Sequence, residues 1–390
     1  MGSRPLRLLP FACGALLLAL AAPARGQDTV SPDLSQVLPI RVLIGSGSSV
    51  SLVFPPEHSA SAGPKVLLDQ ASTPLTWKLG AHGGHVTVTV QGGQTLDLGT
   101  DRLNLQNAPG LAFLYGGKAY RGNATVIAHD TNLNVVNALP VEDYVRGVLP
   151  AEMPSGWPME ALKAQAVIAR TYAISRLTQT GEYDVCATTA CQVYGGMGAE
   201  AERGDEAAEA TRGLIAAYAG KPARTFFHSD SGGFTASSRE VWGEAIPYLP
   251  AQPDPDSRAA RAGWSVKPTM DTISAVMNRC APNAGAYRGL KVTEKTESGR
   301  VYGLAFTGTR GTATVDGARA QDCFRSLGAQ STLGDITSSS PLQIDGSGWG
   351  HGVGLSQYGA KNMAARGWTF DQILGFYYPG VTLANYNVVH

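Results

Sequence analysis

Residues 139–172 read LPVEDYVRGVLPAEMPSGWPMEALKAQAVIARTY, and this stretch predicts two helices separated by a short break. The first helix is expected over residues 141–149. The second begins with Pro158, whose missing N–H costs nothing in a first turn, and reaches about Leu177. Glu152 therefore stands at the seam between the two helices.

The second helix carries apolar residues at spacings of three and four, which predicts an amphipathic helix with a buried stripe. The stripe consists of Met159, Leu162, Ala166, Ala169, Ala173 and Leu177. Lys163 and Arg170 lie on a neighbouring face, two turns and about 10 Å apart along the axis. Such charges usually form the solvated face of a helix, and the alternative is that they bind anions.

Residues 39–127 show short apolar alternations between glycine-rich turns, which predicts an all-β portion. Beyond it, helical and strand-like segments interleave, which favours an α+β fold over a doubly wound sheet. Helices are expected near 207–214, 269–279, 355–366 and 371–377, and strands near 223–227, 300–306 and 312–315. We expect a β-rich accessory portion over residues 27–127 and a mixed helical and β region over 128–390.

The N-terminus predicts an exported protein. Arg4 and Arg7 precede an apolar run over residues 8–21, followed by small residues, and this pattern is typical of a secretory signal peptide, here residues 1–26. No second apolar stretch is long enough to span a bilayer, so no retained transmembrane helix is expected. Lys and Arg total 31 against 31 Asp and Glu, and nothing in this balance indicates a nucleic-acid partner.

Glu152 is the candidate acid. Met153 and Pro154 follow it, and Trp157 is close by. Apolar neighbours disfavour a charged carboxylate and raise its pKa toward the range that a general acid needs near neutrality. The alternative is a structural Glu that caps the next helix or forms an ion pair with it.

Several motifs together resemble the stage II sporulation protein D (SpoIID, amidase enhancer) family. The matching runs are LPVEDYVRGV at 139–148, AEMP at 151–154, EALKAQAVIARTY at 160–172, QVY at 192–194, HSDSGGFT at 228–235 and GWGHGVGLSQYGA at 348–360. They span roughly residues 137–378, and the β portion fits the resemblance more loosely.

The resemblance implies a lytic transglycosylase that cleaves peptidoglycan glycan strands already stripped of their stem peptides, without a cofactor. Glu152 matches the catalytic acid, and Lys163 and Arg170 match basic positions that the family needs. Arg170 is expected to bind the free lactyl carboxylate of N-acetylmuramic acid. The other matched residues expected to line the sugar cleft are Gln192, Tyr194, His228, Ser229, Ser231, His351 and Gln357.

One acid is enough for this chemistry. Most glycosidases use two carboxylates, one of which activates water or acts as nucleophile. In a lytic transglycosylase the C6 hydroxyl of the sugar attacks instead and leaves a 1,6-anhydro end, so one residue can serve as acid and then as base. Glu142 and Asp143, two or three turns upstream, are expected to be structural.

Two glycine-containing motifs invite other interpretations. His228 with Ser229 and Ser231 suggests a Ser-His hydrolase, but the strand-turn-helix GxSxG elbow is absent. The glycines of residues 346–354 suggest a phosphate loop, but the Lys-Ser/Thr of such a loop is absent. A tight turn that allows close approach of the backbone to a sugar, with His351 and Gln357 pointing inward, is the expected role.

Four cysteines remain after the signal peptide, and an exported setting favours disulfides. Some members of the resembled family bind zinc near Cys186 and Cys191 with help from His. No His lies between Tyr172 and Cys191, so a disulfide or two free thiols are expected there instead of zinc. Cys280 is expected to pair with Cys323.

Two further functions stay open. The family's other name suggests a binding module that stimulates a cell-wall amidase without cutting anything, and a zinc-dependent wall hydrolase is the third class. The expected partners are glycan strands and, in the second case, an amidase. The expected location is the periplasm, the cell wall or the extracellular space.

Overall fold

A computed structural model describes residues 39–90, 92–178, 180–257 and 263–386. The fold is α+β with an all-β N-terminal region, as predicted. The predicted signal peptide lies outside the described residues. Within the described ranges, no helix is both long and apolar enough to cross a membrane.

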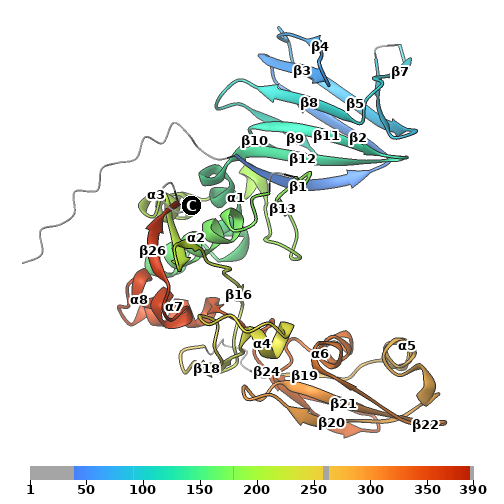
Figure 1. The fold of residues 1–390 in the computed structure, drawn as a ribbon, viewed down its shortest axis with the longest axis vertical. Coiled ribbons are helices and arrows are strands. Elements are labelled where there is room, and N and C mark those ends of the chain that lie inside the picture. Colours follow the sequence, from blue (N-terminus) through green and yellow to red (C-terminus); the bar gives the residue numbers. More distant parts are fainter. Residues whose placement is uncertain (1–38, 91, 179, 258–262, 387–390) are drawn as a thin grey trace, which may run out of the picture. The chain divides into compact units, whose positions relative to one another are not determined.

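The N-terminal region contains two sheets that share one hydrophobic core (Figure 1). The strand orders are β13-β1-β12-β11-β8-β3-β4 and β10-β9-β2-β5-β6-β7, and every pairing is antiparallel except β1 with β13. The strands are β1 (Pro39–Gly47), β2 (Ser49–Phe54), β3 (His58–Ala62), β4 (Lys65–Leu68), β5 (Leu75–His82), β6 (His85–Thr89), β7 (Thr95–Asp97), β8 (Arg102–Asn107), β9 (Ala112–Tyr115), β10 (Lys118–Arg121), β11 (Asn123–His129), β12 (Asn132–Pro140) and β13 (Val185–Cys186).

The β region continues beyond residue 127. The expected division between 27–127 and 128–390 falls inside β11, which pairs with β12, and β12 pairs with β1. Pro140 ends β12, and the first helix begins at the next residue. The division into two domains therefore stays a proposal.

A helical layer follows, built around α2 (Figure 1). Its helices are α1 (Val141–Glu152), α2 (Met159–Ile174), α3 (Glu202–Ala210), α7 (Gln357–Ala365) and α8 (Phe370–Tyr377). α2 contacts the other four, and its side chains are buried almost continuously over residues 161–173. The prediction of an amphipathic α2 was wrong, because elements distant in sequence cover the face that was expected to be solvated.

Short strands accompany these helices. They are β14 (Leu214–Tyr218), β15 (Lys221–Pro222), β16 (Phe227–His228), β17 (Phe234–Thr235), β18 (Gln252–Pro253), β25 (Leu355–Ser356) and β26 (Thr382–Asn385), with α4 (Ser238–Trp242) and the 3-10 helix η1 (Gly196–Ala199). The helix expected at 207–214 begins and ends earlier in the chain, since α3 spans Glu202–Ala210 and Leu214 starts β14. The strand expected at 223–227 is reduced to β16.

Residues 263–347 form a further α+β unit with its own core. Its strands and helices are β19 (Gly263–Val266), α5 (Met270–Cys280), η2 (Pro282–Ala284), β20 (Tyr287–Lys295), β21 (Val301–Gly308), β22 (Gly311–Asp316), α6 (Gly317–Ser326), β23 (Gly334–Ser339) and β24 (Leu342–Ser347). A disulfide between Cys280 and Cys323 joins α5 to α6, as expected.

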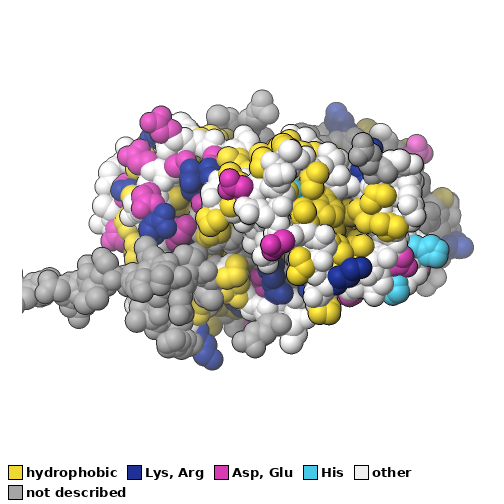
Figure 2. Space-filling view, turned by 90° about the horizontal axis from the view of Figure 1, so that it is seen from above, with side chains coloured by type: hydrophobic (Ala, Val, Ile, Leu, Met, Phe, Trp, Pro, Cys, Tyr) yellow, Lys and Arg dark blue, Asp and Glu magenta, His cyan; other side chains and the backbone are white. Residues whose placement is uncertain are grey.

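The face of the molecule drawn in Figure 2 shows Lys and Arg side chains interspersed with Asp and Glu, in keeping with the equal numbers of the two charge types.

Prolines set the end of α1. Pro154 disfavours helical geometry at Met153, which is extended with φ −136° and ψ 130°. Pro158 then caps α2, one position earlier than the first turn where it was expected. Glu152 is thus the last residue of α1, three residues beyond the expected end of that helix at Leu149, and the chain turns away directly after it.

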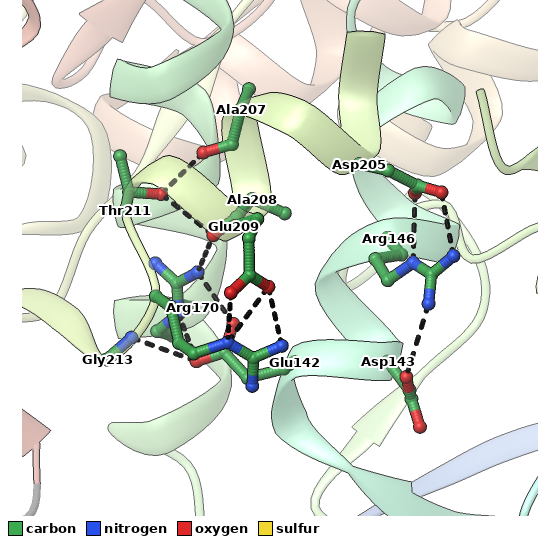
Figure 3. A network of polar contacts seen from close by, with 11 residues as sticks. Glu142, Asp143, Arg146, Arg170, Asp205, Ala207, Ala208, Glu209, Thr211 and Gly213 are labelled. Atoms are coloured by element: carbon green, nitrogen blue, oxygen red, sulfur yellow. Dashed lines mark hydrogen bonds and ion pairs between the residues drawn. The ribbon is translucent and has the colours of Figure 1, made fainter. Parts of the chain in front are cut away.

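A buried ion pair ties this layer together (Figure 3). The Arg170 guanidinium of α2 donates to both carboxylate oxygens of Glu142 in α1, at 2.9 and 2.8 Å. It also donates to the carbonyls of Ala208 and Leu214, and Glu142 accepts from the Gly213 N–H. Arg170 is fully buried and Glu142 is nearly so, and their network links α1, α2, α3 and β14.

We predict that Glu142→Ala destabilises the fold by about 3–5 kcal/mol, because it leaves Arg170 buried without its counter-charge. The matched control is Glu209→Ala, which breaks an exposed pair with Arg212 and is expected to cost less than about 1 kcal/mol. Urea unfolding followed by circular dichroism measures both. Equal, small losses of unfolding free energy in the two variants would show that the buried pair contributes no more to stability than the exposed pair.

Candidate functional site

The ends of α1 and α2 open onto a cavity of about 530 Å³. The other walls come from the loop after β13, the segment around β16, the end of α4 and the glycine-rich loop before β25. The lining residues are Glu152, Tyr172, Arg176, Thr189, Ala190, Cys191, Phe226, Phe227, His228, Ser229, Trp242, Trp349, Gly350, His351 and Gln357.

Glu152 is half-buried in this cavity. Its Oε1 accepts a hydrogen bond of 2.7 Å from the Val193 N–H, and its backbone carbonyl accepts one of 3.0 Å from the Gln357 Nε2. Burial raises the pKa of the Glu152 carboxyl, and the Val193 N–H opposes that rise only in part. Its place at the negative end of the α1 dipole acts in the same direction as burial. Both effects shift the Glu152 carboxyl toward its neutral form.

Two neutral imidazoles face the same cavity, with ring centroids 5.5 Å apart. Burial lowers the pKa of His351 to about 4 and that of His228 well below its ordinary value, and the nearby Arg300 cation adds to both effects. The His228 Nδ1 donates to the Val353 carbonyl at 3.2 Å, so its Nε2 is the acceptor. That Nε2 is buried and has no partner among the described residues.

Aromatic rings form much of the wall. Trp242 packs against Phe226 and His351, with centroids 4.5 and 5.3 Å apart. Trp349 is 54% exposed and Trp242 is 43% exposed, although both line the cavity. Flat apolar faces beside hydrogen-bonding groups suit the amphipathic faces of sugar rings.

A disulfide between Cys186 and Cys191 closes the loop that carries Thr189 and Ala190 along the cavity. Neither sulfur is then the thiolate that a zinc ligand must be. Among the described residues, no group of three or more His, Cys, Asp and Glu is arranged to hold a metal ion. The bridge instead holds the loop just ahead of Val193, whose N–H reaches Glu152.

The glycine-rich loop brings backbone close to the chain's own side chains. Gly350 has φ +105°, and an added Cβ would lie 2.8 Å from the Cβ of His228. At Gly352 an added Cβ would overlap the guanidinium of Arg300. The expected approach of this backbone to a sugar stays a prediction; the structure shows close packing against His228 and Arg300, while His351 and Gln357 line the cavity.

Arg170 does not reach the cavity, so its expected contact with a substrate carboxylate was wrong. Its donors are engaged by Glu142 and two backbone carbonyls, and it has no exposed surface. Lys163 also lies outside the cavity lining and pairs with Glu160 at 2.8 Å on the same helix. Arg170 and Glu142 are structural in this fold, the latter as expected, whereas the role expected for Lys163 stays a prediction.

Three more predicted cleft residues are buried polar groups instead. The Gln192 Oε1 accepts from the Tyr144 hydroxyl, and the Tyr194 hydroxyl donates to the Asn137 Oδ1. The Ser231 hydroxyl donates to Asp254 at 2.9 Å. Each of these side chains bonds to a buried partner in the interior. The presence of a hydroxyl or amide group therefore did not predict whether the residue lies in the cavity.

The remaining candidates, Glu152, His228, Ser229, His351 and Gln357, do meet at the cavity. Sequence reasoning missed Arg176, Trp242 and Trp349. Trp349 could have been found, because it occupies the unassigned position between two glycines of the GWGHG motif. Arg176 lies four residues beyond the matched run ending at Tyr172, where no motif drew attention to it.

Comparison with known proteins places this sequence in a family. Residues 129–218 match the SpoIID family, described as stage II sporulation protein, and this segment includes Glu152. A protein of Brachyspira hyodysenteriae that has no assigned function is 34% identical over 286 residues, which cover 71% of this chain and 76% of that protein. The chain belongs to the SpoIID family.

Named relatives of the SpoIID family support this assignment. The amidase enhancer of Bacillus subtilis is 32% identical over 291 residues, 62% of this chain, but only 40% of that longer protein is covered. Stage II sporulation protein D of the same organism is 29% identical over 269 residues, covering 64% of this chain and 76% of that protein. Residues 256–354 match a separate family described as a domain of unknown function (DUF8618).

We predict that Glu152→Gln makes the protein more stable than the wild type at pH 7. A carboxyl whose folded-state pKa is raised opposes folding above that pKa, and the penalty disappears as pH falls toward about 4, where the unfolded side chain is protonated as well. Gln still offers an oxygen to the Val193 N–H. Urea unfolding between pH 7 and pH 4 measures the difference.

The control is Glu209→Gln, because Arg212 lowers the pKa of that exposed carboxyl. Its substitution is expected to have a small effect of the opposite sign at pH 7. A Glu152→Gln protein that is less stable at pH 7, or equally stabilised at all pH values, would contradict a raised pKa for the Glu152 carboxyl in the folded protein.

Proposed function

We propose that this protein is a lytic transglycosylase that cleaves the bond between N-acetylmuramic acid and N-acetylglucosamine in peptide-stripped peptidoglycan strands. The observation that carries the proposal is a half-buried acid with a raised pKa, Glu152, in a cavity walled by aromatic rings. Membership of the SpoIID family supports it. The names of the relatives support a role in the cell wall or in sporulation.

The absence of a second acid favours transglycosylation over hydrolysis. Among the described residues that line the cavity, Glu152 is the one carboxylate. Hydrolases of both stereochemical types use two carboxyl groups separated by about 5–9.5 Å. Intramolecular attack by the sugar needs no water activation, so it suits a cavity with one acid.

The proposed mechanism uses Glu152 twice. Its protonated carboxyl donates a proton to the glycosidic oxygen as the bond from that oxygen to C1 of the muramic sugar breaks. The resulting carboxylate takes the proton of the C6 hydroxyl while the C6 oxygen bonds to C1, which restores the acid and gives the 1,6-anhydro end. No water is consumed.

Neighbouring groups would position the strand. Burial keeps the His228 imidazole neutral, so it offers no competing acid. Trp242 and Trp349 present ring faces to the sugar. The Val193 N–H and the disulfide loop hold the Glu152 carboxylate in place.

We further propose that the protein is exported and acts in cell-wall remodelling or sporulation, with a cell-wall amidase as a partner that strips the peptides. A second candidate function is a binding module that enhances an amidase without cutting. The printed name of the Bacillus subtilis relative favours it, although this chain spans only 40% of that protein.

Purified protein with peptide-free glycan strands should give 1,6-anhydro ends, detected by mass spectrometry. Glu152→Gln should lower the rate by about 10²–10⁴-fold, since it removes the general acid and base. Glu209→Gln, the same chemical change at an exposed site, should leave the rate unchanged.

Other outcomes separate the alternatives. Reducing ends in place of anhydro ends would mean that water is the acceptor and that the protein is a hydrolase. Binding of strands with no cleavage, together with stimulation of an added amidase, would support the enhancer function. Loss of cleavage with a chelator would point to a metal-dependent hydrolase.

A further inference from the structure

Arg176 is a cation in the cavity without a counter-ion. It follows the C-terminal end of α2 and is half-buried among the lining residues. In the described ranges, no carboxylate pairs with its guanidinium and no acceptor is bonded to it. Other arginines do pair with carboxylates, namely Arg41, Arg121, Arg146, Arg170, Arg212, Arg224, Arg279 and Arg366.

The surroundings of Arg176 orient it. Its guanidinium carbon lies 3.5 Å from the centroid of the Tyr172 ring, at stacking distance, and 5.9 Å from that of Phe226. A guanidinium stacked on one face keeps its edge of N–H donors available, and that edge matches a carboxylate bidentately. Burial already lowers the pKa of Arg176, and an anionic ligand would compensate the lost hydration.

Among the described residues, Arg176 forms no ion pair with Glu152. Its charge is not among the causes that shift the pKa of Glu152, which are burial and the Val193 N–H. Both charges act on Tyr172, whose pKa Arg176 lowers and Glu152 raises. The cavity thus contains a guanidinium and a carboxyl that do not form an ion pair with each other.

We propose that Arg176 is a specificity-determining residue that binds the carboxylate of an acidic sugar, the lactyl group of N-acetylmuramic acid, beside the scissile bond. The inference rests on the proposed function for the choice of sugar. The stem peptide converts that carboxylate into a neutral amide, so Arg176 distinguishes stripped strands from intact ones. It equally distinguishes them from chitin, which has no lactyl group.

The test measures binding in the non-cleaving Glu152→Gln protein, so that its outcome is independent of the chemistry. Three probes of equal length are compared by calorimetry: a peptide-free glycan strand, the same strand with its lactyl carboxyls amidated, and a chitin oligomer. We expect the carboxylate strand to bind about 10- to 100-fold more tightly than the other two.

Adding Arg176→Gln should remove that preference and leave binding of the two neutral probes within about twofold. Arg176→Lys, which keeps the charge but loses the planar fork, should retain part of the preference. The matched control is Arg224→Gln, because Arg224 is a nearby cation outside the cavity lining and pairs with Glu244. It should retain the whole preference.

Three results would overturn the proposal. Equal losses on all three probes after Arg176→Gln would mean that the residue only supports the cavity. An equal effect of Arg224→Gln would mean that the overall positive potential near the cavity, and not a direct contact with Arg176, selects the anion. A Glu152→Gln protein without preference for the carboxylate strand would remove the role entirely. A clear preference in the Glu152→Gln protein, combined with no anhydro product from the wild type, would refute the cleavage chemistry while leaving the binding role of Arg176 intact.

Discussion

The buried pair of Arg170 with Glu142 is the constraint on which the site depends. It joins the start of α1 to the last turns of α2 and to the chain between α3 and β14. The candidate acid is the last residue of α1, and Tyr172 and Arg176 belong to the end of α2 and the residues after it. Groups on two different helices can share a cavity only if the helices hold one arrangement, and a desolvated, fully bonded ion pair tolerates few others.

Desolvation then decides the charge state of the cavity. Glu152, His228 and His351 all shift toward their neutral forms because burial disfavours charge. Arg300, a buried cation bonded to the Ser231 and Phe234 carbonyls, lowers the pKa of both imidazoles further. The result is a cavity in which burial disfavours the charged forms of these three side chains. The cavity also contains one permanent cation, Arg176, which cannot lose its proton at any working pH.

Local features of the fold could be predicted from the sequence. Pro154 and Pro158 marked the break between the helices, and the three-and-four spacing marked α2, since both depend on the chain within a few residues. The surroundings of α2 could not be predicted, because α7 and α8 come from residues nearly 200 positions later. The same limit affected Gln192, Tyr194 and Ser231, which have the right chemistry but partners that only the tertiary structure reveals.

Arg170 and Arg176 show most clearly what sequence reasoning leaves undecided. They are the same residue type, six positions apart on one stretch of chain, and the matched motif favoured the first as the anion-binding residue. A guanidinium is available to a ligand only if the fold leaves its donors unsatisfied, and Glu142 satisfies those of Arg170 from 28 residues away. Arg176 stacks on Tyr172, which takes up a face of the guanidinium but none of its donors. Whether an arginine stabilises the fold or recognises a substrate is therefore set by its partners, and those are determined by long-range packing.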